Sequence, residues 1–592
     1  MQSSCKKQKK TVISEHVYAL EFQEEVSKHW QEGTPIKKDN LEMITEPFRV
    51  CRISNFLDNE LLEKLKEDVQ KVPSRRSDID LYRFEHTEDL ANVDATSVRA
   101  LRDAFTNDIV SWMERNTGIE LDGKVSMASS KYIDGDYLLC HDDNMGDRRI
   151  AYVLYLTKNW LPKDGGALEL FNKDKDGSPK NVVYSLLPEY NSLVFFEVTE
   201  NSYHQVAEVT SDKTRLSVNG WFHGPIDERK PKNSKRSEIP EPPLFDPEEN
   251  VKVKLQEMIN ELYLKPSTIE QIQENVEQES YVFLSNFFKK DLYQKISEEI
   301  ASKNIKWTKV GPADLRNYET ASEDSFSDEL KRFLSLFRSI EFFRLLKGYT
   351  ELDLEPSEDI DKDCGPKGSM ELQRWTCGDY TLMSDKLSSD QNMSMSWTNN
   401  MKRDRFNKDP KEFENSCRSK YNDDGCKGAT NSPKQAGGSD TVCATTKKTT
   451  EEKSNSTLTP RAAQPSSARS SDYDDSDVSD IGDYLSDQDD HLEDSGSNES
   501  SSQNALEPGT LDVILQFHTG HLWETETIDY MEPEQQDGAL ITIPAEDNHL
   551  CLVYRTQGTT RVHRYVSHRE KEFFYNLVCT YHEQSEAPEN AD

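Results

Sequence analysis

Two short segments of the sequence contain the residue types that bind a metal ion. Residues 131–156 read KYIDGDYLLCHDDNMGDRRIAYVLYL, and residues 203–224 read YHQVAEVTSDKTRLSVNGWFHG. The first segment contains His141 and Asp143, two positions apart, and the second contains His204. A β-strand points alternate side chains to the same face, so we expect His141 and Asp143 to reach one ion from one face of a strand. A second strand would bring His204 to the same ion.

These three donors define the kind of metal site. Two imidazoles and one carboxylate on one side of a metal form the facial triad typical of non-heme Fe(II) oxygenases, which leaves other positions open. A closed structural zinc site needs a fourth protein ligand, and neither segment offers one. The residues therefore indicate an iron site with room for a chelating cosubstrate and O2.

An arginine follows the second histidine along the chain. Arg215 lies in the run TRLSVNGWF, which reads as a strand after the turn-forming SDK. The planar donors of a guanidinium bind a carboxylate through two hydrogen bonds, which suits the far end of a dicarboxylic acid. Tyr155, in the alternating run RRIAYVLYL, is placed to offer a hydroxyl to the same carboxylate.

The order of these residues resembles a known family. A His-x-Asp pair, a distant His and an Arg just beyond it, among short strands, are similar to the double-stranded β-helix oxygenases that use Fe(II) and 2-oxoglutarate. The spacing of Tyr132, Gly135, Tyr137, His141 and Asp143 resembles the prolyl-hydroxylase branch. CHDD followed by RRIAYVLYL, then LVFFEV, HQV and RLSVNGWFHG, resembles the ribosomal prolyl 3-hydroxylases more closely.

The resemblance covers residues 15–228 well and the remainder loosely. It implies one Fe(II) per subunit, 2-oxoglutarate and O2 as cosubstrates, and ascorbate to restore iron after uncoupled turnover. It implies hydroxylation, at C3, of a prolyl residue in a small-subunit ribosomal protein, with an effect on translation. By this resemblance the metal ligands are His141, Asp143 and His204, and the cosubstrate-binding residues are Arg215, Tyr155 and Tyr132.

Other interpretations of these residues remain open. An isolated His-x-Asp pair in a chain with 13 histidines is usually a surface accident, but the ordered set argues against that. Tyr132 has an alternative place in the protein core, and we expect His223 and Cys140 to be structural. The chain could also be an oxygenase that acts on a different protein residue, or a non-catalytic scaffold with a vestigial metal site.

Length and composition limit the class of protein. A chain of 592 residues with 34% hydrophobic residues is long enough for two or more domains. No run of 18 apolar residues is present, and the basic cluster near the N-terminus is not followed by an apolar segment. The ten cysteines form no Cys-x-x-Cys pair, which favours reduced thiols. We therefore expect no membrane span and a location in the cytoplasm and nucleus.

The net charge indicates the kind of partner. A formal charge of −37 argues against direct nucleic-acid binding, because such proteins present basic faces to phosphates. A basic protein partner fits better, and ribosomal proteins are basic. The oligomeric state stays open, with a monomer favoured.

The hydrophobic pattern predicts a mainly β protein with flanking helices (α+β). Helices are expected at 16–30, at 58–72 with Asp58 or Asn59 as N-cap, and at 97–116, with a strand at 47–57. Short strands separated by turn signals follow, as a double-sheet jelly roll requires. We expect these strands near 124–134, 137–142, 149–157, 166–171, 181–187, 192–198, 203–209 and 214–223.

The second half of the chain repeats the first. The shared landmarks keep the same order, and GDY occurs at corresponding places in both copies. Such a repeat predicts a duplicated fold, so the chain would hold two tandem double-stranded β-helix domains. The matched segments are 53–69 with 284–300, 126–142 with 369–385, 191–198 with 548–555, and TRLSVNGWF with KEFFYNLVC.

The second copy has lost the metal-binding residues. The alignment places His141 on Ser384, Asp143 on Lys386, His204 on Arg561 and Arg215 on Glu572. A lysine and an arginine at ligand positions would repel a divalent cation. The second copy is therefore expected to be degenerate and non-catalytic, as a packing partner or a substrate-recruiting module.

We divide the chain accordingly. The catalytic double-stranded β-helix oxygenase domain is assigned to 1–228, a linker to 229–248, and the second double-stranded β-helix domain to 249–386 and 506–586. Residues 387–505 form an acidic insertion, predicted to be disordered because it holds too little apolar surface to offset the entropy of ordering. The serines of its acidic stretch are candidate phosphorylation sites, and the stretch as a whole is a candidate for attracting a basic client; a solvated insertion without function is the alternative.

Overall fold

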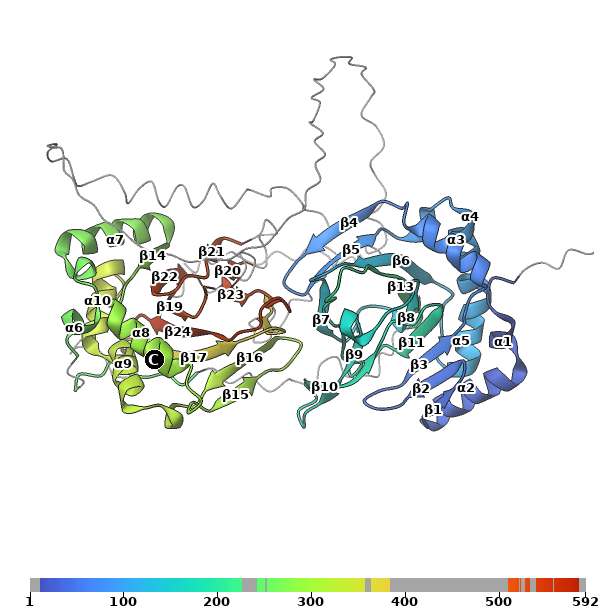
Figure 1. Ribbon diagram of the computed structural model, residues 1–592, viewed down its shortest axis with the longest axis horizontal. Helices are drawn as coiled ribbons and strands as arrows, with labels where there is room; N and C mark the ends of the chain where they lie inside the picture. The colour runs from blue at the N-terminus through green and yellow to red at the C-terminus, as the bar shows by residue number, and fades with distance from the viewer. Residues whose placement is uncertain are drawn as a thin grey trace, which may run out of the picture. The chain divides into compact units, whose positions relative to one another are not determined.

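The computed structural model describes two β-rich regions. Figure 1 shows the helices and strands of both regions. The predicted insertion at 387–505 and most of the predicted linker lie outside the described residues, as do Ser384 and Lys386. The described residues are 11–225, 242–250, 253–356, 364–383, 509–520, 522, 527–532, 539–556 and 558–584.

The first region begins with helices whose ends follow from the sequence. In helix α3 (Asn59–Val69), the Asp58 side chain accepts hydrogen bonds from two backbone N–H groups of the first turn. Leu62, Leu65 and Val69 lie on the buried face of this helix. Both the predicted helix and its Asp58 cap are therefore confirmed.

The other helices of this region are α1 (Glu15–Tyr18), α2 (Leu20–Glu32), α4 (Thr96–Ala104) and α5 (Val110–Thr117). A π-helical turn joins α4 to α5, so the single helix predicted at 97–116 is interrupted. In Figure 1 these helices lie along one side of the first sheet. The buried rings of Trp30 and Trp112 both contact Phe195 of the sheet and anchor the helical layer.

The first sheet has thirteen antiparallel strands in the order β1-β2-β3-β11-β8-β13-β6-β5-β7-β12-β9-β10, with β4 paired to β5. All eight strands predicted between residues 124 and 223 are present. The strands are β1 (Ile36–Lys38), β2 (Leu41–Ile44), β3 (Val50–Ser54), β4 (Ser74–Asp78), β5 (Tyr82–Thr87), β6 (Val125–Tyr132), β7 (Tyr137–His141), β8 (Arg148–Tyr155), β9 (Leu168–Lys173), β10 (Pro179–Leu186), β11 (Ser192–Glu197), β12 (His204–Val206) and β13 (Arg215–His223).

Alternation along the strands separates two buried surfaces of this sheet. One surface packs against the helices through residues such as Leu154 and Val218. The opposite surface forms a smaller interior that includes Ala151, Tyr155 and Leu170. A strand points successive side chains to opposite faces. Candidate site residues on β12 and β13 are therefore those whose side chains point into this smaller interior.

The second region contains a sheet of the order β14-β22-β19-β24-β17-β16-β15, with β18 paired to β16, and a second sheet of the order β21-β20-β23. The strands are β14 (Tyr281–Ser285), β15 (Trp307–Val310), β16 (Arg316–Ala321), β17 (Lys367–Trp375), β18 (Tyr380–Thr381), β19 (Thr510–Phe517), β20 (Ile528–Met531), β21 (Ile541–Ile543), β22 (His549–Arg555), β23 (Thr560–His563) and β24 (Phe574–His582). The helices are α6 (Leu255–Met258), α7 (Pro266–Glu279), α8 (Lys290–Ile300), α9 (Asp328–Arg338) and α10 (Ile340–Thr350).

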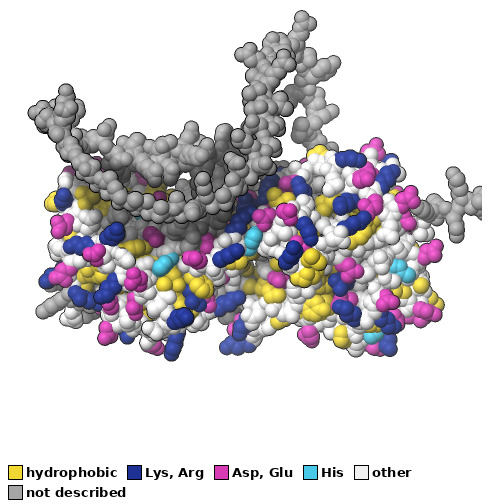
Figure 2. All heavy atoms as spheres, viewed as in Figure 1, with side chains coloured by type: hydrophobic (Ala, Val, Ile, Leu, Met, Phe, Trp, Pro, Cys, Tyr) yellow, Lys and Arg dark blue, Asp and Glu magenta, His cyan; other side chains and the backbone are white. Residues whose placement is uncertain are grey.

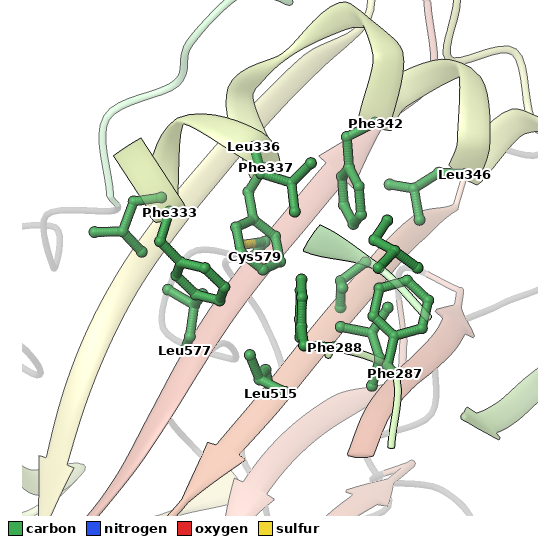
Figure 3. Close-up of a cluster of buried hydrophobic side chains, with 14 of the residues drawn as sticks. Phe287, Phe288, Phe333, Leu336, Phe337, Phe342, Leu346, Leu515, Leu577 and Cys579 are labelled. Atoms are coloured by element: carbon green, nitrogen blue, oxygen red, sulfur yellow. The ribbon is translucent and has the colours of Figure 1, made fainter. Parts of the chain in front are cut away.

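The core of the second region is rich in phenylalanine. Figure 3 shows Phe333 and Phe337 of α9 and Phe342 of α10 facing Leu515 and Leu577 of the sheet. Each such buried side chain contributes roughly 1.5–3 kcal/mol to stability relative to leaving it exposed.

The surface has a different composition. On the face shown in Figure 2, acidic and basic side chains are interspersed. The mainly β class with flanking helices is confirmed in both regions.

The two regions share a strand order. The series β3-β11-β8-β13-β6-β5 of the first corresponds to β14-β22-β19-β24-β17-β16 of the second. The backbone pair between Val209 and Asp136 also recurs, with the same direction of hydrogen bonding, between Val566 and Asp379. The long-range connections thus follow the repeat seen in the sequence.

Part of the predicted linker at 229–248 packs against the second region. The backbone of Phe245 exchanges two hydrogen bonds with Gly368 of β17, at 2.7 and 2.9 Å. The Phe245 ring lies against Phe343, with ring centroids 6.5 Å apart. The high proline and charge content of this segment gave no sign in the sequence that Phe245 packs.

Among the helices of the described residues, no long apolar helix that could span a membrane is found.

We expect Asp58→Ala to lower the free energy of unfolding of the first region by about 1 kcal/mol, because the first turn of α3 loses its side-chain acceptor. Thermal and denaturant unfolding, followed by fluorescence, measure the change. Glu67→Ala, on the exposed face of the same helix, is the matched control, and an equal loss in the control would contradict the capping role.

Candidate metal centre

Two neighbouring strands bring the histidines together. His141 is the last residue of β7, His204 is the first residue of β12, and the two face each other directly in the antiparallel register. Their ring centroids are 4.3 Å apart. Residues opposite each other on antiparallel strands have their side chains on the same face, so both imidazoles reach the same space.

Asp143 reaches this space by a different route from the one predicted. β7 ends at His141, and Asp143 follows in a turn with a left-handed backbone, at φ 61°. Aspartate is one of the few residues that adopt this conformation readily. The expectation that strand alternation aligns His141 with Asp143 was therefore wrong, although the two side chains do converge.

The three side chains form one group. Potential ligand atoms from His141, Asp143 and His204 all lie within 4.8 Å of one another. The Nε2 atoms of the two histidines are each 3.5 Å from a different oxygen of the Asp143 carboxylate. It is the one such group of His, Cys, Asp and Glu found among the described residues. The donor set fits Fe(II), because its three ligands come from one side.

Backbone hydrogen bonds fix the tautomer of both histidines. Nδ1 of His141 donates to the carbonyl of Leu139, and Nδ1 of His204 donates to the carbonyl of Ser202, each at 2.7 Å. With the proton on Nδ1, the lone pair of Nε2 is available to a metal. Such outer hydrogen bonds orient metal-binding imidazoles and raise their basicity.

The charges of the group suit a divalent cation. Burial opposes ionisation of Asp143, but its contacts with His141 and His204 hold the pKa of the carboxyl well below its ordinary value. Burial, together with repulsion from His141, lowers the pKa of His204 to about 4. At neutral pH the group therefore presents a carboxylate and at least one neutral imidazole, the forms that bind metal.

Arg215 begins β13 and lies in the same interior. Its side chain is buried, and its guanidinium carbon lies 4.9 Å from the centre of the Tyr132 ring and 5.1 Å from that of Tyr155. Nε donates to the carbonyl of Gly166 at 2.8 Å. This bond holds the guanidinium in place and leaves the two Nη groups for a bidentate partner.

The two predicted tyrosines flank the arginine. The hydroxyl of Tyr155 is buried beside the guanidinium of Arg215, so both groups are available to the same ligand carboxylate. Burial raises the pKa of Tyr155, with the charge of Arg215 opposing the change. Tyr132 faces Arg215 across the β6–β13 pair and also stacks on Phe84, at 4.7 Å between centroids. Tyr132 therefore belongs both to the site and to a small core cluster.

Three further residues, Arg148, Asn219 and Trp221, were not expected from the sequence. The guanidinium carbon of Arg148 lies 3.6 Å from the centre of the Trp221 ring, and Nη1 of Arg148 is 3.7 Å from Oδ1 of Asp143. The Trp221 indole N–H and the Asn219 side-chain oxygen are buried without a hydrogen-bond partner in the described residues. Asn219 and Trp221 follow Arg215 at even spacings on β13, a period-2 signal that could have identified them.

The two residues expected to be structural occupy structural positions. His223 bonds through Nδ1 to Asp147 and through Nε2 to Ser126, both at 2.5 Å, which fixes the end of β13. Cys140 is buried in a separate cluster with Phe171 and Tyr203. Its side chain is on the face of β7 opposite to His141, as alternation requires.

Family models match both regions of the chain. Residues 127–223 match the 2OG-Fe(II) oxygenase superfamily, and residues 250–589 match the family described as Oxoglutarate and iron-dependent oxygenase degradation C-term. The first match contains all three candidate ligands and Arg215. The second covers more than half of the chain.

Curated relatives extend this result. The chain is 36% identical over 359 residues to Prolyl 3-hydroxylase OGFOD1 of Mus musculus, an alignment covering 60% of this chain and 65% of the mouse protein. It is 35% identical over 389 residues to Prolyl 3-hydroxylase OGFOD1 of Xenopus laevis, covering 61% and 74%. It is 34% identical over 372 residues to Prolyl 3-hydroxylase sudestada1 of Drosophila melanogaster, covering 61% and 68%. The alignment thus spans slightly less than two thirds of the mouse protein.

Solved structures also match parts of the chain. A prolyl-4-hydroxylase of Pseudomonas putida aligns with 21% identity and a TM-score of 0.25, over 30% of this chain and 92% of that one. A prolyl hydroxylase of Trichoplax adhaerens, in complex with a hypoxia inducible factor peptide, aligns with 18% identity and a TM-score of 0.26, over 29% and 83%.

The site and the family matches define a 2-oxoglutarate-dependent dioxygenase. The chain belongs to the family of iron- and 2-oxoglutarate-dependent oxygenases that includes the prolyl 3-hydroxylases.

We expect Arg215→Met to raise the KM for 2-oxoglutarate at least roughly tenfold, because hydrogen bonds to a charged group contribute about 1.5–3 kcal/mol. Initial rates of succinate formation at varied 2-oxoglutarate measure the change. Arg149→Met, which removes an exposed guanidinium that bonds to the Pro225 carbonyl, is the control. An unchanged KM in Arg215→Met would exclude Arg215 as the carboxylate anchor.

Proposed function

We propose that this chain hydroxylates a prolyl residue of a protein substrate at C3. One Fe(II) would be held by His141, Asp143 and His204, and 2-oxoglutarate by Arg215 with Tyr155 and Tyr132. The observation that carries the proposal is the convergence of the three donors in the same interior that contains the buried guanidinium of Arg215.

The balanced reaction consumes one 2-oxoglutarate and one O2 for each C–H bond oxidised. One oxygen atom enters the new hydroxyl group, and the other enters succinate as CO2 is released. Bound Fe(II) supplies the redox chemistry that O2 activation requires. The chain's own residues bind and orient: Arg215 fixes the distal carboxylate, and the surrounding apolar side chains exclude water.

Arg148, Asn219 and Trp221 are suited to the substrate side of the site. They lie near Asp143 or continue β13 beyond Arg215, and two of them carry buried hydrogen-bonding atoms without partners. A peptide backbone offers one donor and one acceptor per non-prolyl residue, which matches the Asn219 oxygen and the Trp221 N–H. We therefore assign the backbone around the target proline to these residues.

We propose a basic ribosomal protein of the small subunit as the substrate, with an effect on translation. The net charge of −37 favours encounter with a basic partner. The names of the curated relatives support a prolyl target. Ascorbate as a supporting reductant, a monomeric state, and a location in the cytoplasm and nucleus complete the proposal.

We further propose that the second region is a degenerate copy of the double-stranded β-helix, so that the domains are arranged in tandem at 1–228, and at 249–386 with 506–586. The recurring pair Val566–Asp379 aligns Arg561 with His204, as the sequence indicated. Arg561 donates to the buried carboxylate of Asp512 at 2.8 Å. A guanidinium paired with its own carboxylate would occupy the place of the metal.

The strand register changes one detail of that alignment. Arg215 faces Tyr132 in the first region, whereas Phe574 faces Trp375 at the corresponding rung of the second. The counterpart of Arg215 is therefore Phe574, and the predicted match with Glu572 was two residues out of register. The rings of Trp375 and His563 stack at 3.9 Å, so aromatic side chains fill the place of the cosubstrate. This filling supports a non-catalytic second domain.

Two other functions remain candidates. An oxygenase acting on another protein residue would use the same metal centre. Asn219 and Trp221 favour an extended peptide as substrate, but they do not select proline over another residue. A non-catalytic scaffold with a vestigial metal site would not need to retain three converging donors, fixed histidine tautomers and a buried guanidinium. We therefore place the hydroxylase first.

In small-subunit ribosomal proteins from cells lacking this chain, we expect one prolyl residue to lose its hydroxyl group. The proline-containing peptide would then be lighter by about 16 Da, the mass of one oxygen atom. Mass spectrometry after re-expression of the wild type or of His204→Ala measures it. The wild type should restore the modification and the variant should not. An unchanged modification in the deleted cells would contradict the ribosomal substrate.

Peptides with and without proline separate the alternatives in vitro. Succinate formation above the uncoupled level should require the proline-containing peptide. Equal stimulation by a proline-free peptide would favour another target residue, and no turnover with either peptide would favour the scaffold.

A further inference from the structure

A short segment of the second region contacts the first region beside its metal-bearing strands. We call residues 565–569 the docking segment. The carboxylate of Glu208 accepts hydrogen bonds from the Ser567 hydroxyl and from the backbone N–H of His568, both at 2.7 Å, and from the Tyr565 hydroxyl at 3.3 Å. All three donors belong to the docking segment.

The docking segment also contacts the turn between β6 and β7. Asp134 in this turn is bonded to Nε2 of His568 at 2.8 Å and accepts from Nη2 of Arg569 at 2.6 Å. The rings of Tyr137 and Tyr565 stack, with centroids 4.1 Å apart. The docking segment therefore contacts two separate segments of the first region, the β6–β7 turn and the segment around Glu208.

Each of these two contacted segments lies between a candidate metal ligand and a candidate cosubstrate-binding residue. The β6–β7 turn joins Tyr132 to His141, and Glu208 lies between His204 and Arg215. Two backbone hydrogen bonds tie the segments together, from Gly135 to the Val209 carbonyl at 2.8 Å and from Val209 to the Asp136 carbonyl at 2.9 Å. A displacement of either segment would thus move the other.

A third bond connects Glu208 to the arginine. The backbone N–H of Gly166 donates to the Glu208 carbonyl at 3.0 Å, and the Gly166 carbonyl accepts from Nε of Arg215. A side chain on Gly166 would crowd the arginine, because a Cβ there would lie 3.0 Å from Cδ of Arg215, and the backbone φ of +63° also favours glycine. One glycine therefore transmits the position of Glu208 to the guanidinium.

The burial of Glu208 shows that this contact is built into the fold. The residue is only 6% exposed, and burial raises the pKa of its carboxyl despite the three hydrogen bonds. A buried polar group that loses its partners costs about 1–3 kcal/mol, and more when it is charged. The three donors to the Glu208 carboxylate all belong to the docking segment, which therefore stabilises Glu208 in its place.

We infer that the docking segment positions the 2-oxoglutarate end of the active site: Ser567 and His568 hold Glu208, and Glu208 holds Gly166 and Arg215. The inference rests on the proposed function for the identity of the cosubstrate. It gives the second region a specific task, since a non-catalytic copy completes the hydrogen bonding of the catalytic one. Ser567 and His568 are positioning residues and do not touch the cosubstrate.

The test uses the full-length double variant Ser567→Ala/His568→Ala. We expect the KM for 2-oxoglutarate to rise about three- to tenfold with little change in kcat at saturating cosubstrate, because the variant loosens a position without removing a binding group. The dissociation constant of 2-oxoglutarate for the Mn(II)-loaded protein, measured by calorimetry, should rise by the same factor. Ser335→Ala/His549→Ala, a matched pair of changes elsewhere in the second region, should leave both values at those of the wild type.

Hydrogen exchange gives a readout that needs neither metal nor cosubstrate. The amides of Gly135, Gly166 and Val209 should exchange faster in the double variant than in the wild type. Ser567→Thr, which keeps the hydroxyl, should behave as the wild type. If the double variant does not fold, Glu208→Gln tests the same contact, with the same expected rise in KM and faster exchange.

The outcomes distinguish this inference from the proposed function. A folded double variant with unchanged affinity for 2-oxoglutarate and unchanged exchange would overturn the positioning role. A comparable loss of affinity in the control pair would overturn it as well. A wild type that forms no succinate would refute the proposed function, while faster exchange at the three amides would still support the mechanical link.

Discussion

The direct opposition of His141 and His204 on two antiparallel strands is the constraint on which the rest of the site depends. Register places both imidazoles on one face, and Asp143 joins them only because the chain turns immediately after β7 with a left-handed residue. A slip of one residue between β7 and β12 would send one histidine to the opposite face. The backbone acceptors for both Nδ1 atoms then leave each Nε2 free for the metal.

The second β-rich region shares a strand order with the first. In its interior Arg561 donates to the buried carboxylate of Asp512, and the rings of Trp375 and His563 stack. A buried charge is tolerated only with a partner, so each of these two charged side chains requires the other. Residues 565–569 of this region contact Glu208 and Asp134 of the first region.

Much of the site could be predicted from the sequence. Strands are recognisable by the alternation of polar and apolar residues, and only a few residue types bind metal ions. His141, Asp143, His204 and Arg215 converge as expected, and the eight strands that carry or support them are present. What local pattern could not provide was long-range register: the sequence aligned Arg215 with Glu572, whereas Phe574 is the residue that faces Trp375 in the way that Arg215 faces Tyr132. The polar β4–β5 hairpin was also missed, since its half-buried residues give no hydrophobic period. Glu208 could not be recognised at all, because its partners lie more than 350 residues away.

We propose that His141, Asp143 and His204 hold a single Fe(II) on one side and leave the other side open. Anaerobic reconstitution followed by iron analysis, with titration of 2-oxoglutarate into the reconstituted protein and observation of the visible charge-transfer absorption of its Fe(II) chelate, tests it most directly. We expect one iron per chain and the appearance of this absorption in the wild type, with both lost in His141→Ala and retained in His223→Gln. Full iron binding and an unchanged absorption in His141→Ala would contradict it.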